Sequence, residues 1–263
     1  MRVCEPPRFE KGKITMIRIT LAMLFLILFL ICTIPVMTFE QIIWKKHKDF
    51  HDKSSLAIVL WAFRVVLFIC GTKVIVKNKE NVPTDTPVLY VGNHRSFFDI
   101  IITYTLVPRP TGYVAKKELE KVPLLRWWMR HLYCLFLDRN DIKQGLKTIL
   151  TGVEQVKSGV SMTIFPEGTR NKGEEGTMLP FKEGSFKIAE KANVPVVPMT
   201  IVNSSAIFED HFPRVKPQTV IVDYGTPIYI KELDKETQKN FGTHVREIIL
   251  NTYTEDKKEL PTK

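Results

Sequence analysis

One stretch of the chain combines polar residues whose types and spacing could do chemistry. Asn93-His94-Arg95-Ser96-Phe97-Phe98-Asp99 comes directly after the apolar run Pro87–Val91. An imidazole can take a proton from an alcohol, and a carboxylate bonded to its other nitrogen fixes the tautomer and stabilises the imidazolium. His94 and Asp99 are therefore a candidate general base and its orienting partner. No serine or cysteine nucleophile is needed if the substrate supplies the attacking hydroxyl.

The same residues also have a purely structural interpretation. Ser96 and Asp99 stand three positions apart ahead of the apolar Ile100–Ile102, which is the pattern of a helix capping box. Asp99 would then only close the first turn of a helix, and His94 would be an ordinary turn residue. Spacing alone leaves both interpretations open.

A second stretch, Phe165-Pro166-Glu167-Gly168-Thr169-Arg170, also ends an apolar run. Gly168 permits a positive φ or close backbone approach, and the guanidinium of Arg170 presents a fork of donors suited to a phosphate. The alternative is a tight turn with a surface Glu–Arg pair. The sequence contains neither a Walker A loop nor a dinucleotide-binding fingerprint, so nucleotide chemistry lacks its usual phosphate cradle.

The elements that must position these residues alternate between strand and helix beyond Thr72. This indicates an α/β domain over residues 72–263, with a largely parallel central sheet flanked by helices. The predicted strands are Lys73–Lys77, Pro87–Val91, Tyr113–Ala115, Cys134–Leu137, Ser161–Phe165, Val194–Val202 and Thr219–Tyr224. The predicted helices are Phe97–Leu106, Leu124–Leu132, Asp141–Lys157, Gly184–Ala192 and Glu236–Leu250, and the charged tail after Thr252 is expected to fray.

Residues 1–71 differ in character and predict a membrane-anchoring helical hairpin. Ile19–Phe39 contains about 21 residues, enough to cross a bilayer core, and no small-residue cleavage site favours a signal peptide instead. Leu56–Cys70 is about 15 residues with Arg64 at its centre, which is short for a span and favours an interfacial or re-entrant helix. A core helix of the following domain is the alternative for this second segment.

The charge balance suggests an anionic partner. There are 38 Lys and Arg against 28 Asp and Glu, a net charge of +10. Lys45, Lys46 and Lys48 beside the first apolar segment suit a membrane surface carrying anionic lipid. A further candidate membrane-facing strip, with a solvated helix face as its alternative, consists of Lys116, Lys117, Lys121, Arg126, Trp127, Trp128 and Arg130.

The cysteines and histidines indicate neither a disulfide framework nor a metal site. Cys4, Cys32, Cys70 and Cys134 have no metal-ligand or redox-pair spacing. We therefore expect the catalytic domain to face a reducing cytoplasm.

Taken together, the two stretches resemble the glycerolipid acyltransferase family, and within it the bacterial 1-acyl-glycerol-3-phosphate acyltransferases. The family's N-H-x-S-x-x-D block stands at Asn93–Asp99, and its F-P-E-G-T-R block stands intact at Phe165–Arg170. Its second block corresponds to Ala115–Leu119 leading to Phe136–Arg139, and its fourth to Val194–Pro198. Many relatives carry a glycine ahead of the Asp-Arg pair where this chain has Tyr133 and Cys134.

The resemblance implies direct transfer of a fatty acyl chain from an acyl thioester, either acyl-CoA or acyl-ACP, to the sn-2 hydroxyl of lysophosphatidic acid. It implies His94 as the base and Asp99 as its partner. Arg170 with Lys116 would hold the phosphate, with Arg139 as a further candidate. Glu167, Gly168 and Thr169 would shape that pocket. No metal or other cofactor is implied.

The resemblance also implies the partners and the location. We expect a lysophospholipid, an acyl thioester, possible contact with acyl carrier protein, a lipid bilayer and no nucleic acid. The protein would belong to the cell membrane. Two alternatives stay open: an acyltransferase for glycerol-3-phosphate, another lysophospholipid or an amino-lipid, and a non-enzymatic module that binds anionic lipid.

Overall fold

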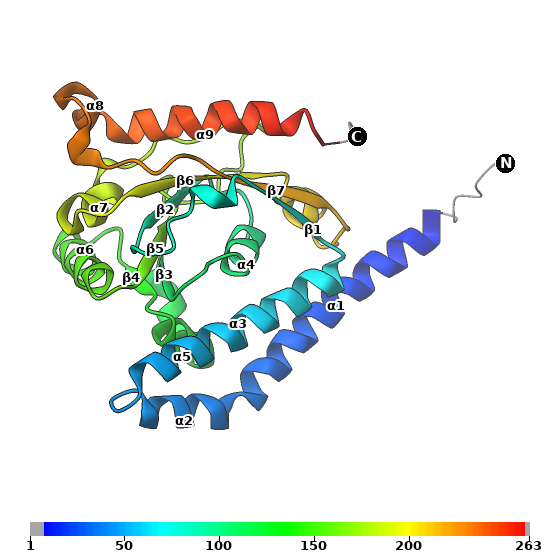
Figure 1. Ribbon diagram of the computed structural model, residues 1–263. Coiled ribbons are helices and arrows are strands. Elements are labelled where there is room, and N and C mark those ends of the chain that lie inside the picture. The colour runs from blue at the N-terminus through cyan, green and yellow to red at the C-terminus, as the bar shows by residue number, and fades with distance from the viewer. Residues whose placement is uncertain (1–7, 261–263) are drawn as a thin grey trace.

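A central sheet forms the middle layer of the molecule in the computed structural model, which describes residues 8–260 (Figure 1). Its seven strands are β1 (Lys73–Lys77), β2 (Leu89–Gly92), β3 (Thr111–Lys116), β4 (Leu135–Leu137), β5 (Ser161–Ile164), β6 (Val196–Val202) and β7 (Thr219–Tyr224). Each corresponds to a predicted strand.

The sheet is largely parallel, as predicted. The strand order is β1-β7-β6-β2-β5-β3-β4, and every neighbouring pair is parallel except β6 with β7. The strands β6, β2, β5, β3 and β4 therefore share one direction. Their carboxyl ends lie along one edge of the sheet, where functional groups of such folds gather.

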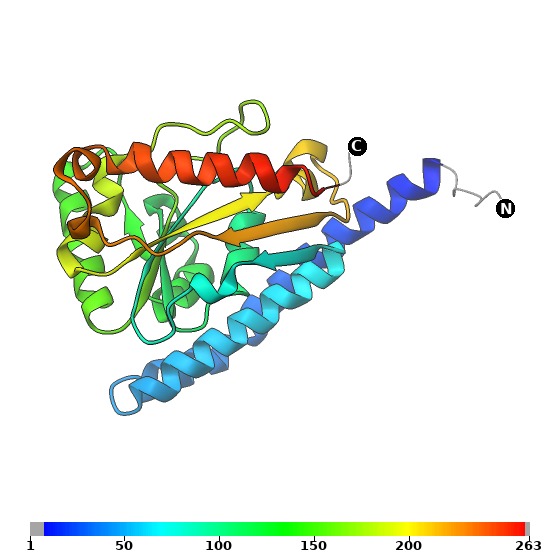
Figure 2. The ribbon, with the colours of Figure 1, turned by 45° about the horizontal axis from the view of Figure 1, so that its top comes forward.

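Helices cover both faces of the sheet, which explains why the central strands are continuously apolar. In β2, Leu89 and Val91 lie in one core and Tyr90 lies in the other. The first core also contains residues of α6 (Ile142–Lys157), α7 (Lys187–Ala192) and α9 (Phe241–Lys257). The second contains residues of α4 (Phe98–Tyr104), α5 (Pro123–His131) and the N-terminal helices. Figure 2 shows α9 along one face and the N-terminal helices along the other.

The N-terminal helices form the predicted hairpin, but its first arm is not one helix. α1 (Arg8–Cys32) and α2 (Ile34–Ile43) meet at a bend of 46°. Pro35 lies in the first turn of α2, where its missing N–H is tolerated but cannot extend the preceding helix. The apolar run Ile19–Phe39 therefore folds as a bent pair instead of one straight span.

The second arm is longer than the apolar run predicted. α3 (Lys48–Cys70) has 23 residues, because the polar residues 48–55 continue the helix and its buried face. Among the described residues, one single helix, α3, is both long enough and apolar enough to cross a membrane. The bent pair would count as a second. The sequence analysis therefore underestimated the length of this helix, and its expectation that the segment is too short to span a membrane was wrong.

The C-terminal end is ordered further than predicted. α8 (Lys235–Lys239) and α9 divide the predicted helix at Asn240, and α9 continues past Thr252. Tyr253 is buried, and Lys77 Nζ donates to Asp256 Oδ1 at 2.6 Å. These contacts with the sheet core and with β1 hold the segment that was expected to fray. Short 3₁₀ helices complete the fold: η1 (Lys79–Asn81), η2 (Lys117–Lys121), η3 (Glu183–Phe186), η4 (Ser205–Ile207), η5 (Glu209–His211) and η6 (Ile230–Glu232).

Candidate active site

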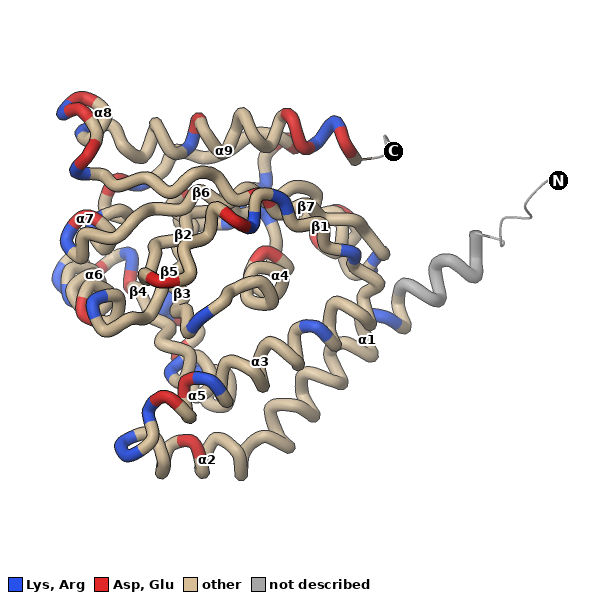
Figure 3. The backbone as a smooth tube through the Cα atoms, viewed as in Figure 1, with Lys and Arg blue, Asp and Glu red and all other residues tan. Residues whose placement is uncertain are grey.

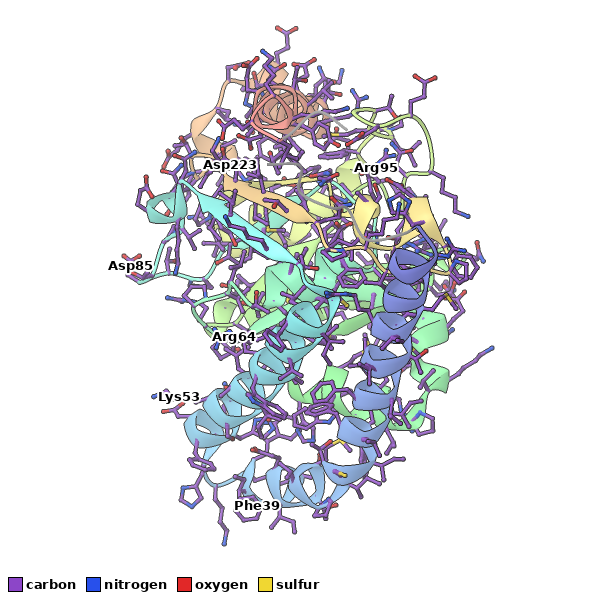
Figure 4. All side chains as sticks on the ribbon, turned by 90° about the vertical axis from the view of Figure 1, so that its right-hand side faces the viewer. Phe39, Lys53, Arg64, Asp85, Arg95 and Asp223 are labelled. Carbon is purple, nitrogen blue, oxygen red and sulfur yellow. The ribbon has the colours of Figure 1, made fainter. Side chains whose placement is uncertain are left out.

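The two stretches singled out from the sequence leave the sheet side by side. β2 and β5 are neighbours with Val91 opposite Ile164, so the loops that follow them start at the same edge. The Asn93 side chain bonds both backbone groups of Ile201 in β6 at 2.8 Å, which holds the start of the first loop. Figure 4 labels Arg95 in this loop, at the opposite end of the molecule from Phe39 in the hairpin.

His94 and Asp99 form a hydrogen-bonded pair. His94 Nδ1 lies 2.8 Å from Asp99 Oδ2, and the same oxygen accepts the backbone N–H groups of Arg95 and Ser96 at 2.8 Å each. Asp99 is fully buried, and these three donors fix its carboxylate. An Nδ1–H that donates to a carboxylate leaves the lone pair on Nε2. No described residue bonds Nε2, and the His94 side chain is 15% exposed, so this nitrogen is placed to act as a base.

The capping interpretation of the same residues is correct in part. Ser96 Oγ accepts the N–H of Phe98 at 2.9 Å while Asp99 accepts the N–H of Ser96. The bond from Ser96 N–H to Asp99 is one half of a capping box, but Ser96 Oγ accepts the N–H two positions on instead of that of Asp99, three positions on. The two interpretations do not compete, because the cap is what places the carboxylate beside the imidazole.

Two residues of the second stretch, Glu167 and Phe165, contact His94 in the first loop. Glu167 is buried, its Oε1 accepts the N–H of His94 at 2.8 Å, and its Oε2 accepts the N–H of Leu179 at 2.9 Å. Burial raises the pKa of Glu167, while the two backbone bonds act in the opposite direction. The Phe165 ring stacks on the His94 ring with centroids 4.3 Å apart. Glu167 and Phe165 thus hold the backbone and the ring plane of His94.

The rest of the second loop forms a turn with the predicted backbone. Gly168 has a φ of 72°, in the left-handed region that favours glycine. Thr169, next in the turn, is exposed.

Arg170 lies beside the first turn of α4. Its guanidinium carbon stands 3.6 Å from the centre of the Phe97 ring, and its Nη1 lies 3.3 Å from Glu209 Oε1. The predicted pairing of Glu167 with Arg170 within the turn was therefore wrong, because Arg170 pairs with Glu209 while Glu167 accepts backbone N–H groups. The remaining guanidinium donors have no hydrogen bond to any described residue.

Lys116 and Arg139 lie further along the same edge: Lys116 is the last residue of β3, and Arg139 follows β4. They line a pocket of about 470 Å³ together with Lys117, Glu118, Lys121, Leu137, Asp138 and Asn140. Lys117 Nζ pairs with Asp138 Oδ2 at 3.0 Å, while Lys116 and Arg139 are exposed. The structure brings these two cations together in one pocket. It does not bring them into contact with Arg170, whose partners follow β2 and β6 on the other side of β5.

The chain resembles known proteins along most of this region. A family model described as Acyltransferase matches residues 73–202. The 1-acyl-sn-glycerol-3-phosphate acyltransferase of Helicobacter pylori is 34% identical over 169 residues, which is 61% of this chain and 70% of that protein. The chain belongs to the acyltransferase family.

Two further members of the acyltransferase family extend the comparison. The 1-acyl-sn-glycerol-3-phosphate acyltransferase of Saccharomyces cerevisiae is 32% identical over 73% of this chain, and the match spans 64% of the yeast protein. The crystal structure of the 1-acyl-sn-glycerophosphate (LPA) acyltransferase PlsC from Thermotoga maritima superposes with a TM-score of 0.77 at 23% identity, covering 92% of this chain and 96% of that one. The family resemblance and the fold class predicted from the sequence are thereby confirmed.

The departure from the family pattern at Tyr133 has a structural counterpart. Tyr133 has a φ of 59°, the region that a glycine occupies without steric cost. Its hydroxyl donates to Asp52 Oδ1 of α3 at 2.7 Å. The acyltransferase domain of this chain thus uses a tyrosine at this turn to reach the hairpin.

Two residues that organise the site were missed from the sequence. The first is Asn171, whose N–H donates to the His94 carbonyl at 2.7 Å. The second is Glu209, whose carboxylate accepts hydrogen bonds from Arg170 and from the Ser96 hydroxyl at the start of α4. Glu209 follows β6, the strand next to β2, so its position after a parallel strand was the only available signal.

The predicted membrane-facing strip is wrong at one residue. Trp127 is exposed, whereas Trp128 is buried and donates from Nε1 to Thr33 Oγ1 at 3.0 Å. Adjacent residues of a helix point about 100° apart, so both indoles cannot share one face. Trp128 attaches α5 of the acyltransferase domain to the bend between α1 and α2.

Proposed function

We propose that this protein transfers a fatty acyl chain from an acyl thioester to the sn-2 hydroxyl of lysophosphatidic acid, giving phosphatidic acid. The observation that carries the proposal is the 2.8 Å bond between His94 Nδ1 and the buried Asp99, on a side chain that is 15% exposed and whose Nε2 has no hydrogen bond to any described residue. The family relatives named as 1-acyl-sn-glycerol-3-phosphate acyltransferases support the choice of acceptor. The chain spans less than two thirds of the yeast and coconut relatives, so substrate identity is inferred from shared chemistry.

The reaction needs one base and no covalent enzyme intermediate. Nε2 of His94 takes the proton of the acceptor hydroxyl as its oxygen attacks the thioester carbonyl. Asp99 stabilises the imidazolium that forms. The tetrahedral intermediate collapses with loss of the thiol carrier, which receives the proton from His94. The donor in this proposal is acyl-CoA or acyl-ACP.

Two cationic regions at the same edge of the sheet are candidates to bind the acceptor's phosphate. Arg170 keeps donors free beside the first turn of α4, and Lys116 with Arg139 lines the pocket after β3 and β4. We assign the phosphate to Arg170 and Lys116, with Arg139 as a further contact, because a dianion is bound best by charge-assisted donors. Glu167, Gly168 and Thr169 form the turn that carries Arg170.

The N-terminal hairpin would hold this site at a membrane surface. Figure 3 shows that charged residues are sparse along the part of α1 that is not grey and along α3 beyond Lys53, where Arg18 and Arg64 are the charged residues. Exposed apolar side chains of the hairpin include Ile17, Leu21, Leu24, Ile27, Leu28, Ile31, Phe39, Ile42, Trp61 and Phe68. An exposed apolar surface of this extent favours lipid contact over solvent. The proposal places the protein at the cell membrane with the acyltransferase domain on the cytoplasmic side.

The test measures thiol release from palmitoyl-coenzyme A in detergent, with and without lysophosphatidic acid, for the wild type and His94→Ala. We expect acceptor-dependent release in the wild type. We expect a decrease of about 10²–10⁴-fold in the variant, the contribution of a positioned base. The His244→Ala variant on α9, away from the site, is the matched control and should keep wild-type rates.

Other outcomes separate the alternatives. Release only with glycerol-3-phosphate or another lysophospholipid would change the acceptor but keep the mechanism. Equal release by wild type and His94→Ala would reject His94 as the base. No release with acyl-CoA or acyl-ACP and any of these acceptors, combined with salt-sensitive binding to anionic vesicles, would favour the lipid-binding module.

A further inference from the structure

Glu209 joins the two loops of the candidate active site without belonging to either of them. Its Oε2 accepts the Ser96 hydroxyl at 2.6 Å, and its Oε1 accepts the N–H of Phe97 at 2.8 Å. The same Oε1 lies 3.3 Å from Arg170 Nη1. One carboxylate therefore contacts the loop of His94, the start of α4 and the loop of Arg170.

The position of Arg170 depends on these contacts. Its guanidinium rests on the Phe97 ring on one side and meets Glu209 at one terminal nitrogen. The Arg170 side chain is 29% exposed, so without partners its long stem would sample many rotamers. The Phe97 ring and the carboxylate together restrict the guanidinium while leaving Nε and Nη2 available to a ligand.

Glu209 is itself held by the fold. η5 follows η4 directly after β6, and the Lys216 N–H donates to the Ile207 carbonyl at 2.9 Å, which closes this segment into a loop. The Glu209 side chain is 21% exposed and accepts two further hydrogen bonds, so its carboxylate is oriented before any ligand arrives.

We propose that Glu209 is a positioning residue for the acceptor's phosphate: it holds the guanidinium of Arg170 at the first turn of α4, ready for the anion. The inference rests on the proposed function, because it needs Arg170 to bind a phosphate-bearing acceptor. Glu209 touches neither substrate nor the reacting atoms in this proposal. Its loss should therefore appear in the KM for the acceptor and leave the chemical step largely intact.

The experiment compares Glu209→Ala and Glu209→Gln, each alone and combined with Arg170→Ala, in the acyl-CoA and lysophosphatidic acid assay. We expect Glu209→Ala to raise the acceptor KM about tenfold, the effect of losing one charge-assisted hydrogen bond. Glu209→Gln keeps an acceptor oxygen for Phe97 and should raise it about threefold. The donor KM and kcat should stay within about twofold.

The double variant distinguishes positioning of Arg170 from simple support of α4. In the Arg170→Ala background, Glu209→Ala should add nothing to the acceptor KM, because the group that it positions is gone. Asp210→Asn, the exposed neighbour in η5, is the matched control and should behave as the wild type. Thermal unfolding of each variant shows whether the fold is kept, and Glu209→Gln remains informative if Glu209→Ala unfolds.

Three results would overturn the inference. If the acceptor KM were unchanged in both Glu209 variants but raised in Arg170→Ala, the positioning role of Glu209 would be rejected and the phosphate assignment to Arg170 would be kept. An equal effect of Glu209→Ala with and without Arg170 would show that the carboxylate acts through α4. An unchanged KM in Arg170→Ala would reject both this inference and the phosphate assignment on which it rests.

Discussion

At the scale of single residues, the site depends on carboxylates that each accept several backbone hydrogen bonds. Asp99 Oδ2 accepts three donors, and Glu167 accepts one N–H from each of two separate segments. A carboxylate held in this way keeps its position when the imidazole gains a proton, which lowers the reorganisation required during reaction. Asparagine in place of Asp99 would have nearly the same size, but its NH₂ group is a donor. The groups that surround Asp99 Oδ2 are themselves donors, so this position needs an acceptor.

Gly168 gives a prediction at the same scale. Alanine at its φ of 72° is strained, and its Cβ would lie 3.1 Å from Lys182 Nζ, the mobile end of a long side chain. Because that end can move, most of the cost is backbone strain, and Gly168→Ala should lower the free energy of unfolding by about 1–2 kcal/mol. Denaturant unfolding measures this change.

A second glycine serves as the control for that prediction. A Cβ on Gly184 would meet nothing within 4 Å, and its φ lies outside the left-handed region. Gly184→Ala should therefore stay within about 0.5 kcal/mol of the wild type. If both variants lost the same free energy of unfolding, backbone strain at Gly168 would not be the cause of the loss.

At the scale of elements, a buried polar cluster attaches the hairpin to the acyltransferase domain. His51 Nε2 of α3 lies 2.7 Å from His131 Nδ1 of α5, and His51 Nδ1 lies 3.0 Å from Asp52 Oδ1. Tyr133 donates to the same carboxylate, and Lys48 Nζ lies 3.2 Å from its other oxygen. Hydrogen bonds this specific align α3 with α5, whereas apolar contacts alone would permit sliding.

This cluster predicts a pH dependence of stability. Burial, with His51 nearby, lowers the pKa of His131 to about 4, whereas the unfolded chain has the ordinary value near 6.5. Between these values the unfolded state binds more protons, so stability falls as the pH drops from about 6.5 toward 4. The full effect, reached below pH 4, is roughly 3 kcal/mol, and about 2 kcal/mol of it falls between pH 7 and pH 5. Urea unfolding in detergent at pH 7 and pH 5 measures it.

The matched variants for this pH effect are His131→Gln and His244→Gln. The first removes the buried titrating group and should flatten the loss of stability between pH 7 and pH 5. The second removes a half-buried histidine of α9 and should keep the wild-type dependence. An unchanged pH dependence in His131→Gln would mean that another group controls the acid sensitivity.

At the scale of the whole molecule, the hairpin lies against one face of the sheet and its tip projects away from α8 (Figure 1). The exposed Lys45 and Lys46 lie between α2 and α3 at that tip. Apolar helices with lysines at one end suit an interface, because the lysines can reach lipid headgroups while the helices contact the acyl chains.

Membrane binding therefore predicts a charge effect that is local to the tip. Lys45→Gln with Lys46→Gln should weaken binding to vesicles containing anionic lipid by about 1 kcal/mol per lysine, or roughly fivefold each. The paired variant Lys235→Gln with Lys239→Gln in α8 has the same change in net charge and should bind nearly as the wild type. Vesicle co-sedimentation at low and high salt measures both, and equal losses would indicate a nonlocal charge effect.

The sequence by itself determined the elements and most of the local chemistry. Strands buried on both faces are continuous apolar runs, so β2, β5, β6 and β7 were readable from composition. The edge strand β1 was readable from its Val-Ile-Val run instead. The cap at Ser96 and the positive φ at Gly168 are also local properties, since they depend on residues a few positions apart. The pairing of His94 with Asp99 was predictable for the same reason, because both lie on one turn.

Only the tertiary structure decided which distant residues meet. The polar residues before Leu56 continue α3 because α5 offers them a partner, with His51 Nε2 2.7 Å from His131 Nδ1. Trp128 is buried because it packs against Phe29 of α1, and Thr33, 95 positions earlier, accepts its N–H. Glu209 reaches Arg170 because β6 lies beside β2, an adjacency that follows from strand order and leaves no periodic trace in the chain. Contacts across the sheet edge depend on packing between elements, and local propensity carries no information about them.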